Sequence, residues 1–156
     1  LRAIEIASLK WEMLVDSNGI LSNQISLTNN ASKGSKGGRL IPINKLLKFK
    51  LLEYYELKKR NISFAISDNV ISTQRSKSTT PQTIVNMFQI WYKDLNLIGC
   101  SSHSGRRTAI TNWSRKISIV GGSIRDVQYL AGHSSMQTTS RYIEGNEKSK
   151  LLVVDL

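Results

Sequence analysis

Apolar residues recur every three to four positions along several stretches of the chain, which is the spacing of one face of an α-helix. The longest such stretch runs from Asn44, a residue type that favours the helix N-cap, to Arg60. A second stretch begins at Thr80 and Pro81, where a capping side chain precedes a proline that suits the first helical position, and continues to Leu95. Shorter helices are predicted over residues 1–10, 104–117, 123–131 and 135–143.

Three short segments have the pattern of strands rather than helices. Residues 10–15 and 20–28 flank the turn signal Asp16-Ser17-Asn18-Gly19, and residues 39–43 follow a glycine-rich basic turn. Pro42 in the last segment favours an edge position, because proline donates no backbone hydrogen bond. The sequence therefore predicts an α+β fold that is mainly α-helical, with a small three-stranded antiparallel sheet at one edge.

The composition narrows the class of protein. The chain has 156 residues, a length that fits one domain, and it carries a formal net charge of +11. No apolar run approaches the roughly 18 residues of a membrane span, and the single cysteine, Cys100, excludes an intrachain disulfide and a cysteine-based zinc finger. These values favour a soluble, intracellular domain with a polyanionic partner, most often nucleic acid. Since the first residue is not methionine and the chain opens inside an apparent helix, we expect a fragment.

Two segments near the start of the chain carry basic side chains in suggestive settings. Arg2 and Glu5 lie three residues apart and share a helix face, although taken alone they are best interpreted as a surface ion pair. Between residues 33 and 39, glycines would let a turn approach a ligand closely, with Lys33 and Lys36 on that turn. Taken alone, the turn is best interpreted as a solvated basic loop.

The segment Ser101-Ser102-His103-Ser104-Gly105-Arg106-Arg107-Thr108 opens a predicted helix. The apolar residues on the same helical side as Arg106 are Ala109, Ile110, Trp113 and Ile117. A permanently charged guanidinium is costly on that side unless an anion meets it, whereas Arg107 falls on the opposite side and is expected to be exposed. His103, three residues before Arg106, could converge on the same anion.

His133 and Tyr142 form the last candidate pair. Nine residues apart on one unbroken helix, they would face opposite sides. Gly132 and Ser134 interrupt the helical pattern, so a turn can bring the two side chains together. Tyr142 lies off the apolar stripe of the final helix, where its hydroxyl could be free for chemistry.

Taken together, these four segments resemble the catalytic motifs of the tyrosine recombinases, the phage-integrase family. Leu1-Arg2-Ala3-Ile4-Glu5 resembles the first arginine box, and Ser32-Lys33-Gly34-Ser35-Lys36 resembles the β-hairpin that carries a lysine. His103-Ser104-Gly105-Arg106 matches the H-x-x-R box, and Leu130-Ala131-Gly132-His133, followed by Tyr142, matches the last motifs. Each motif alone is weak evidence for the family. Their occurrence together and in the same order, from residue 2 to residue 142, is strongly specific for it.

The sequence departs from the family pattern in three places. Ala131 stands where the family usually has leucine, which is a harmless core change. The hairpin is one residue longer than common versions, so Lys33 and Lys36 compete for the catalytic role, and Lys33 is favoured. The segment before Arg2 is absent. The resemblance therefore implies that residues 1–156 are a C-terminal catalytic domain, without the start of that domain and without the N-terminal DNA-clamping domain.

The resemblance also implies a catalytic role for each motif. The predicted catalytic residues are Arg2, Lys33, His103, Arg106, His133 and Tyr142. The two arginines would neutralise the scissile phosphate, and the tyrosine would attack it to give a 3′-phosphotyrosyl intermediate. His103 would accept the tyrosine proton or a hydrogen bond, His133 would bind the phosphate, and Lys33 would protonate the leaving 5′-oxygen. Bond energy stays in the covalent link, so no metal or other cofactor is implied.

The partner implied by the family is double-stranded DNA, bound by a homotetramer on synapsed sites. Four further basic residues are predicted to contact that DNA: Lys36, Arg39, Arg107 and Arg115. The expected location is the cytoplasm, in association with the nucleoid of a prokaryotic host.

Three alternatives remain open. A type IB topoisomerase-like enzyme would use the same chemistry but rejoin the original strand, and the Gly132-His133 motif argues against it. A non-catalytic DNA-binding module would have lost the tyrosine or an arginine, and none is lost. A basic RNA-binding module would expose aromatic stacking platforms, whereas Trp91 and Trp113 fall on apolar helical stripes.

Overall fold

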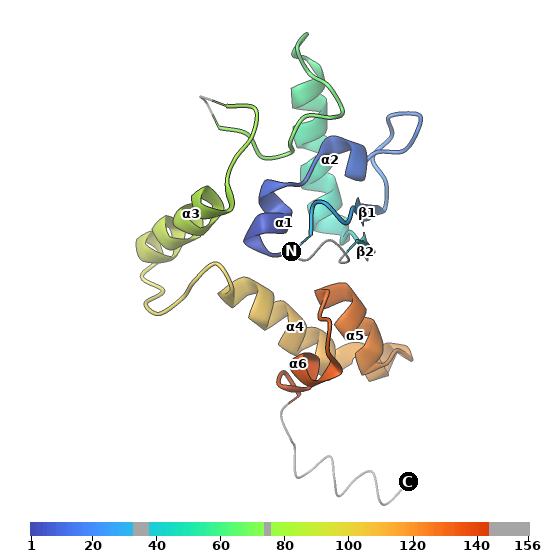
Figure 1. Ribbon diagram of the computed structural model, residues 1–156, viewed down its shortest axis with the longest axis vertical. Helices are drawn as coiled ribbons and strands as arrows, with labels where there is room; N and C mark the ends of the chain where they lie inside the picture. The colour runs from blue at the N-terminus through green and yellow to red at the C-terminus, as the bar shows by residue number, and fades with distance from the viewer. Residues whose placement is uncertain (33–37, 74–75, 144–156) are drawn as a thin grey trace, which may run out of the picture. The chain divides into compact units, whose positions relative to one another are not determined.

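Helix α1 (Ala3–Ala7) begins the first of two units into which the chain divides, Leu1–Arg106 and Arg107–Leu156. The structure is a computed structural model that describes residues 1–32, 38–73 and 76–143 (Figure 1). Within the described residues, no helix is long and apolar enough to cross a membrane.

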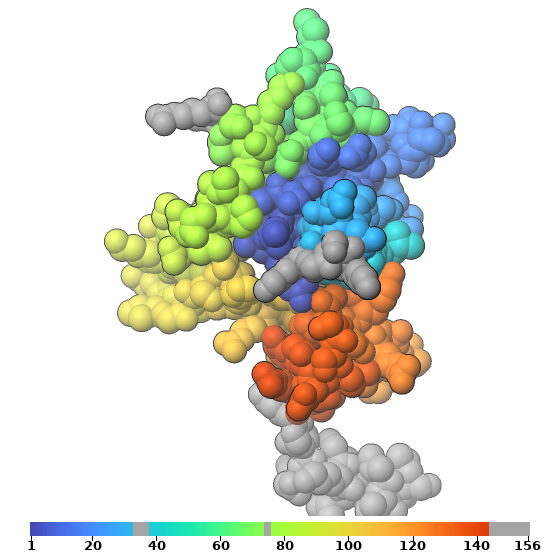
Figure 2. All heavy atoms as spheres, viewed as in Figure 1, coloured from blue at the N-terminus to red at the C-terminus, as the bar shows by residue number. Residues whose placement is uncertain are grey.

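The described residues of the first unit contain a two-stranded antiparallel sheet and three complete α-helices. Strand β1 (Gln24–Leu27) pairs with β2 (Arg39–Pro42), so that Ile25 lies opposite Ile41 and Leu27 lies opposite Arg39. Helix α1 packs against α3 (Pro81–Asp94), and α2 (Lys45–Lys59) follows the sheet. In the space-filling view, the N-terminal segment (dark blue) is flanked by later segments of its own unit (Figure 2).

The prediction of a third strand was wrong for the described residues, in which residues 10–15 form no sheet strand. The short 3-10 helix η1 (Trp11–Met13) occupies this segment, and only isolated bridges flank it, one at Lys10 and one at Val15. The reason lies in the spacing of its core side chains. Trp11 and Leu14, three residues apart, are both fully buried, which a helical turn permits and the alternation of a strand does not.

A continuous apolar core brings together η1, the sheet and α2. The buried residues of this core are Leu9, Trp11, Met13, Leu14, Leu21, Ile25, Leu27, Ala31, Tyr55 and Val70. The ring of Trp11 lies against that of Tyr55, with centroids 5.0 Å apart. The amide of Asn69 donates to the carbonyl of Ala7 over 2.7 Å, which ties the end of α1 to the loop after α2. The C-terminal end of α1 is therefore joined to the loop that follows α2.

The two long helices begin as the sequence predicts. The side chain of Asn44 accepts a hydrogen bond from the backbone N–H of Leu47 over 2.8 Å and caps α2. Thr80 accepts from the N–H of Thr83 over 3.1 Å, and Pro81 occupies the first position of α3. Each bond satisfies a backbone donor that has no partner within its own helix.

The second unit is built from short helices. Helix α4 (Ser104–Lys116) crosses the division between the units and continues into the 3-10 helix η2 (Ile117–Val120). Helices α5 (Ile124–Ala131) and α6 (Met136–Ser140) follow and pack against each other. These bounds confirm the predicted helices, although α6 is shorter than predicted. The small core of the unit consists of Ile110, Val127 and Ala131, with Ile117, Ile124 and Tyr142 packed against it.

Two tryptophans depart from their predicted burial. Trp91 on α3 is 49% exposed and Trp113 on α4 is 39% exposed. Their apolar helical spacing does not lead to burial, because the described cores are formed by other residues of the same units. Both rings are therefore exposed enough to stack on bases, and only the catalytic motifs weigh against the RNA-binding alternative.

Candidate active site

Arg2 is held at the start of α1 by the carboxylate of Glu5. The backbone N–H of Arg2 donates to Oε2 of Glu5 over 2.7 Å, and its guanidinium Nη1 donates to Oε1 over 3.2 Å. The Glu5 side chain is completely buried, whereas that of Arg2 is 25% exposed. The interpretation of this pair as a surface ion pair is therefore wrong. Glu5 is an internal anchor, and the arginine guanidinium remains within reach of solvent.

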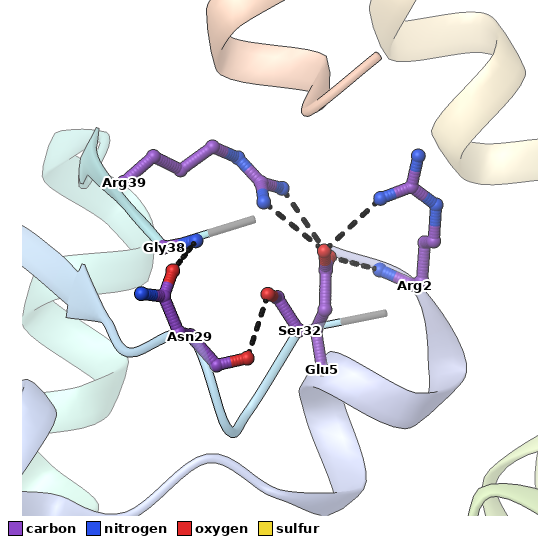
Figure 3. Close-up of polar contacts among 6 residues, drawn as sticks. All are labelled: Arg2, Glu5, Asn29, Ser32, Gly38 and Arg39. Carbon is purple, nitrogen blue, oxygen red and sulfur yellow. Dashed lines mark hydrogen bonds and ion pairs between the residues drawn. The ribbon is translucent and has the colours of Figure 1, made fainter. Parts of the chain in front are cut away.

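A second guanidinium reaches the same carboxylate from β2. Arg39 Nη1 donates to Oε1 of Glu5 over 3.1 Å, and Nη2 donates to Oε2 over 3.3 Å (Figure 3). The Arg39 side chain is only 3% exposed. The sequence predicts this residue as a DNA contact, but the structure buries it in an ion-pair cluster, where its guanidinium faces Glu5 rather than solvent.

The Arg2–Glu5–Arg39 cluster keeps its carboxylate ionised. Burial raises the pKa of the Glu5 carboxyl, but the hydrogen bond from Arg39, the backbone N–H of Arg2 and the two positive charges outweigh burial, and the pKa lies below its ordinary value. Two guanidiniums against one carboxylate leave a net positive charge. The partly exposed member of the cluster can therefore attract an anion.

The segment that opens α4 presents three predicted residues. His103 is exposed, Arg106 is half-buried and Arg107 is exposed. Arg106 is thus less exposed than Arg107, as predicted, but the predicted helical phase holds only in part, because Trp113 of the predicted inner side is exposed and Thr111 of the outer side is half-buried. Two hydrogen bonds organise this turn: Ser101 N–H donates to Ser104 Oγ over 2.9 Å, and His103 N–H donates to Ser101 Oγ over 3.3 Å. Arg115, a predicted DNA contact further along α4, is exposed as well.

A turn after α5 brings His133 and Tyr142 together, as the sequence predicts. Gly132 ends α5 in the left-handed region with φ 62°, a conformation that glycine adopts without strain. The imidazole of His133 then stacks on the phenol ring of Tyr142, with centroids 5.7 Å apart and an interplanar angle of 21°. Tyr142 also packs against the Ile110–Val127–Ala131 core, so its ring is held on two sides.

Two neighbours fix the position of His133. Its Nδ1 lies 3.0 Å from the hydroxyl of Thr139, a residue on α6 that is fully buried. Its backbone exchanges two hydrogen bonds with Gln128: the His133 N–H donates to the Gln128 carbonyl over 3.1 Å, and the Gln128 amide donates to the His133 carbonyl over 3.0 Å. Sequence reasoning missed this role of Thr139, although its place on the inward side of the last helix was a usable signal.

The two lysines predicted on the hairpin, Lys33 and Lys36, lie outside the described residues. In the parts that the structure does describe, no group of three or more histidine, cysteine, aspartate or glutamate side chains could hold a metal ion. The described candidate residues thus form one group in each unit. The first unit holds the Arg2–Glu5–Arg39 cluster and the turn that opens α4, and the second unit holds the His133–Tyr142 pair with Thr139.

Comparison with known proteins identifies what this arrangement is similar to. Residues 1–149 match the model of the phage integrase family. The chain is 28% identical over 130 residues to the tyrosine recombinase XerA of Pyrococcus horikoshii, an alignment that covers 77% of this chain and 43% of XerA.

Solved structures show the same fold. A crystal structure of XerA recombinase matches with a TM-score of 0.72 at 22% identity and covers 97% of this chain. The Tn1549 transposon integrase in complex with a circular intermediate DNA matches with a TM-score of 0.76 at 19% identity and covers 99% of this chain. The chain spans 51% and 54% of these two structures, about half of each.

The predicted helical catalytic-domain fold is therefore confirmed. The matched region of the family model contains every predicted catalytic residue, from Arg2 to Tyr142. The chain belongs to the phage integrase family.

Proposed function

We propose that this chain is the catalytic part of a tyrosine recombinase that cleaves and rejoins DNA through a 3′-phosphotyrosyl intermediate on Tyr142. The observation that carries the proposal is the placement of Tyr142 against His133, next to a buried hydroxyl that holds the imidazole. Membership of the phage integrase family supports it.

The first requirement of the reaction is charge neutralisation at the phosphate. A phosphodiester resists attack because its anionic oxygens repel nucleophiles. In the proposal, Arg2 and Arg106 bind the non-bridging oxygens, for which a planar guanidinium is well suited. Charge grows on these oxygens as the nucleophile approaches, so the two guanidiniums bind the transition state more tightly than the ground state.

The second requirement is an activated nucleophile. A free phenol loses its proton only near pH 10, so attack at neutral pH needs a proton acceptor and positive charge nearby. His103 takes the proton of Tyr142, and the phenolate oxygen attacks phosphorus. When Thr139 donates to Nδ1 of His133, the imidazole proton resides on Nε2, the form that donates to a phosphate oxygen.

The third requirement is a proton for the leaving group. Lys33, or else Lys36, donates a proton to the 5′-oxygen as its bond to phosphorus breaks. The products are the 3′-phosphotyrosyl link and a free 5′-hydroxyl. A 5′-hydroxyl from a second duplex then attacks the link, its proton is lost, and the tyrosine regains its own proton. No bond energy is lost to water, so strand exchange needs no external energy source.

The proposed partner is double-stranded DNA. The net charge of +11 supports it, and one of the matched structures is an integrase bound to a circular intermediate DNA. Lys36, Arg107 and Arg115 are the proposed backbone contacts. Exchange between two duplexes requires four active tyrosines, so we propose a homotetramer on synapsed sites, acting in the cytoplasm.

Covalent trapping on a mixture of sequences tests the proposal. The protein is incubated with a pool of randomised duplexes that carry a nick near each candidate scissile position, so that the released fragment diffuses away and the adduct persists. Wild-type protein should form a denaturation-resistant adduct, and Tyr142→Phe should form none while binding DNA with unchanged affinity. Tyr129→Phe, which removes a hydroxyl from an exposed ring of the same unit, is the matched control.

An adduct of normal yield from Tyr142→Phe would overturn the assignment of the nucleophile. Wild-type protein that binds the pool but forms no adduct would be a non-catalytic DNA-binding module. Relaxation of a supercoiled plasmid that lacks any paired site would indicate a type IB topoisomerase-like activity instead.

A further inference from the structure

Two arginines share the carboxylate of Glu5, but they differ in exposure. The Arg39 side chain is 3% exposed and that of Arg2 is 25% exposed. Each carboxylate oxygen of Glu5 accepts one hydrogen bond from the Arg39 guanidinium. Oε2 also accepts from the backbone N–H of Arg2, and Oε1 also accepts from the Arg2 side chain. Glu5 therefore connects an internal arginine to one that solvent can reach.

The two contacts from Arg39 fix the orientation of the Glu5 carboxylate. A planar guanidinium that donates to both carboxylate oxygens sets the plane of the carboxylate as well as its position. Oε2 and Oε1 are then directed at the backbone N–H and Nη1 of Arg2. Without Arg39, the carboxylate would be buried with only one charged partner, and burial favours its neutral form.

Arg39 is itself held by backbone that has little freedom to move. It opens β2 directly opposite Leu27, and the preceding Gly38 donates its N–H to the Asn29 side chain over 3.0 Å (Figure 3). A Cβ atom at Gly38 would lie 2.8 Å from Asn29 Oδ1, closer than such contacts allow, and 3.0 Å from the Leu27 carbonyl oxygen, which is tighter than most such contacts. The strand therefore enters the sheet at a close backbone approach, which sets where the Arg39 side chain begins.

We propose that Arg39 is a positioning residue for Arg2, acting through the carboxylate of Glu5, and that it makes no contact with DNA. The inference rests on the proposed function, because it takes Arg2 as a ligand of the scissile phosphate. Opposite charge at Glu5 orients the guanidinium of Arg2, and the second guanidinium keeps the cluster positive overall. Arg39 thereby affects the cleavage step while remaining shielded from the substrate.

The primary test compares Arg39→Met with Arg60→Met, which removes the same charge from an exposed position at the end of α2. Adduct formation is measured in single turnover at saturating DNA, and Kd is measured separately. Arg39→Met should slow adduct formation by about 10²-fold, the scale expected when a reacting group is misplaced by about an ångström. Its Kd should change no more than that of Arg60→Met.

A second substrate shows whether the loss acts through Arg2. In a methylphosphonate at the scissile position, a neutral methyl group replaces one anionic oxygen, so less positive charge is needed there. The losses caused by Arg2→Ala and by Arg39→Met should both shrink on this substrate. On the ordinary phosphate, the double variant Arg2→Ala/Arg39→Met should form the adduct only slightly more slowly than Arg2→Ala alone.

Several outcomes would overturn the inference. An unchanged rate at saturating DNA together with weaker binding, and with a salt slope reduced by about 0.9, would make Arg39 a phosphate contact. The role of Arg39 would be purely structural if Arg39→Met slowed adduct formation equally on the phosphate and the methylphosphonate. The same would follow if Arg39→Met slowed the Arg2→Ala variant as much as it slows the wild type. If thermal melting shows that Arg39→Met does not fold, Arg39→Lys replaces it. Lysine keeps the positive charge but lacks the planar guanidinium that donates to both carboxylate oxygens. Arg39→Lys should therefore slow adduct formation less than Arg39→Met, and this effect should again be smaller on the methylphosphonate.

These results are separable from failure of the proposed function. Wild-type protein that forms no adduct at Tyr142 would refute the proposed function itself. A normal wild-type adduct, with an Arg39→Met loss that is independent of Arg2, would refute only the positioning role.

Discussion

In the first unit, opposite charge fixes the key side chain, whereas in the second unit neutral packing does so. Arg2 is oriented by a buried carboxylate that a second guanidinium holds. Tyr142 is oriented by a stacked imidazole and an apolar core, and the imidazole is held by the hydroxyl of Thr139.

The contrast follows from what each side chain is proposed to do. A guanidinium stays protonated at any physiological pH, so a neighbouring carboxylate can orient it without removing its charge. A nucleophilic phenol has to lose a proton, and a carboxylate beside it would disfavour that loss by repulsion. A stacked ring and an apolar core can orient the phenol without this penalty. The two units therefore hold their side chains by different means because one binds charge and the other has to generate it.

The largest expected effect is on the stability of the first unit, in which Glu5 forms ion pairs with two arginines. Glu5→Ala should lower the free energy of unfolding by about 3–5 kcal/mol, because it removes the buried carboxylate that forms an ion pair with the buried Arg39 guanidinium. Chemical denaturation measures this value. Glu56→Ala, which removes the acid of the exposed Lys59–Glu56 pair, is the control and should cost less than about 1 kcal/mol. Equal losses would show that Glu5 contributes no more than a surface ion pair.

The next effect separates the two consecutive arginines of α4. Arg106→Ala should slow adduct formation by about 10²–10³-fold, the scale for removing one donor to a developing oxyanion. Arg107→Ala, at an exposed position, should mainly weaken DNA binding in a salt-dependent way. Single-turnover rates at saturating DNA distinguish the two. Similar rate losses would mean that half-burial of Arg106 does not mark a phosphate ligand.

A smaller effect is expected at the hydroxyl that holds His133. Thr139→Val keeps the shape of the side chain but removes the hydrogen bond to Nδ1, which contributes about 0.5–1.5 kcal/mol. Adduct formation should therefore slow by up to about tenfold. Thr138→Val, on the exposed side of the same helix, should leave the rate unchanged. If the two variants behave alike, packing alone positions the imidazole.

The smallest effect is a difference in acid sensitivity. The pKa of Glu5 is lower in the folded protein than its ordinary value of about 4.3 in an unfolded chain. The ionised carboxylate therefore stabilises the fold fully at pH values above about 4.3, and this contribution is lost as the pH falls through the lowered pKa. Glu5→Gln should therefore flatten the loss of stability on acidification below about pH 4.3. Denaturation curves taken across this range measure it. A slope identical to that of the wild type would mean that Glu5 gains nothing from its two arginines.

Features that depend on neighbours in the sequence were predictable. Asn44 and Thr80 cap helices through a hydrogen bond to the residue three positions on, so the local pattern was sufficient. The turn at Gly132 was predictable because glycine marks the end of a helix, and its consequence, the meeting of His133 and Tyr142, followed.

Features that depend on distant partners were not predictable. The pairing of Arg39 with Glu5 joins residues 34 positions apart, so the periodicity of either segment alone could not indicate it. The same limit explains the missing third strand, because the burial of both Trp11 and Leu14 depends on the surrounding core and not on their own segment. Motif resemblance predicted the site residues without showing which of them are internal.

The shortness of α6 has a consequence for how strand cleavage can be switched. A helix of five residues does not persist in water by itself, so α6 exists only while it is docked on α5. Undocking would withdraw Thr139 from the imidazole and displace Tyr142, two residues beyond the helix, without unfolding the rest of the protein. In the proposed reaction, cleavage would then depend on a local equilibrium of a few residues, and a contact that favours the docked state would act as an activator.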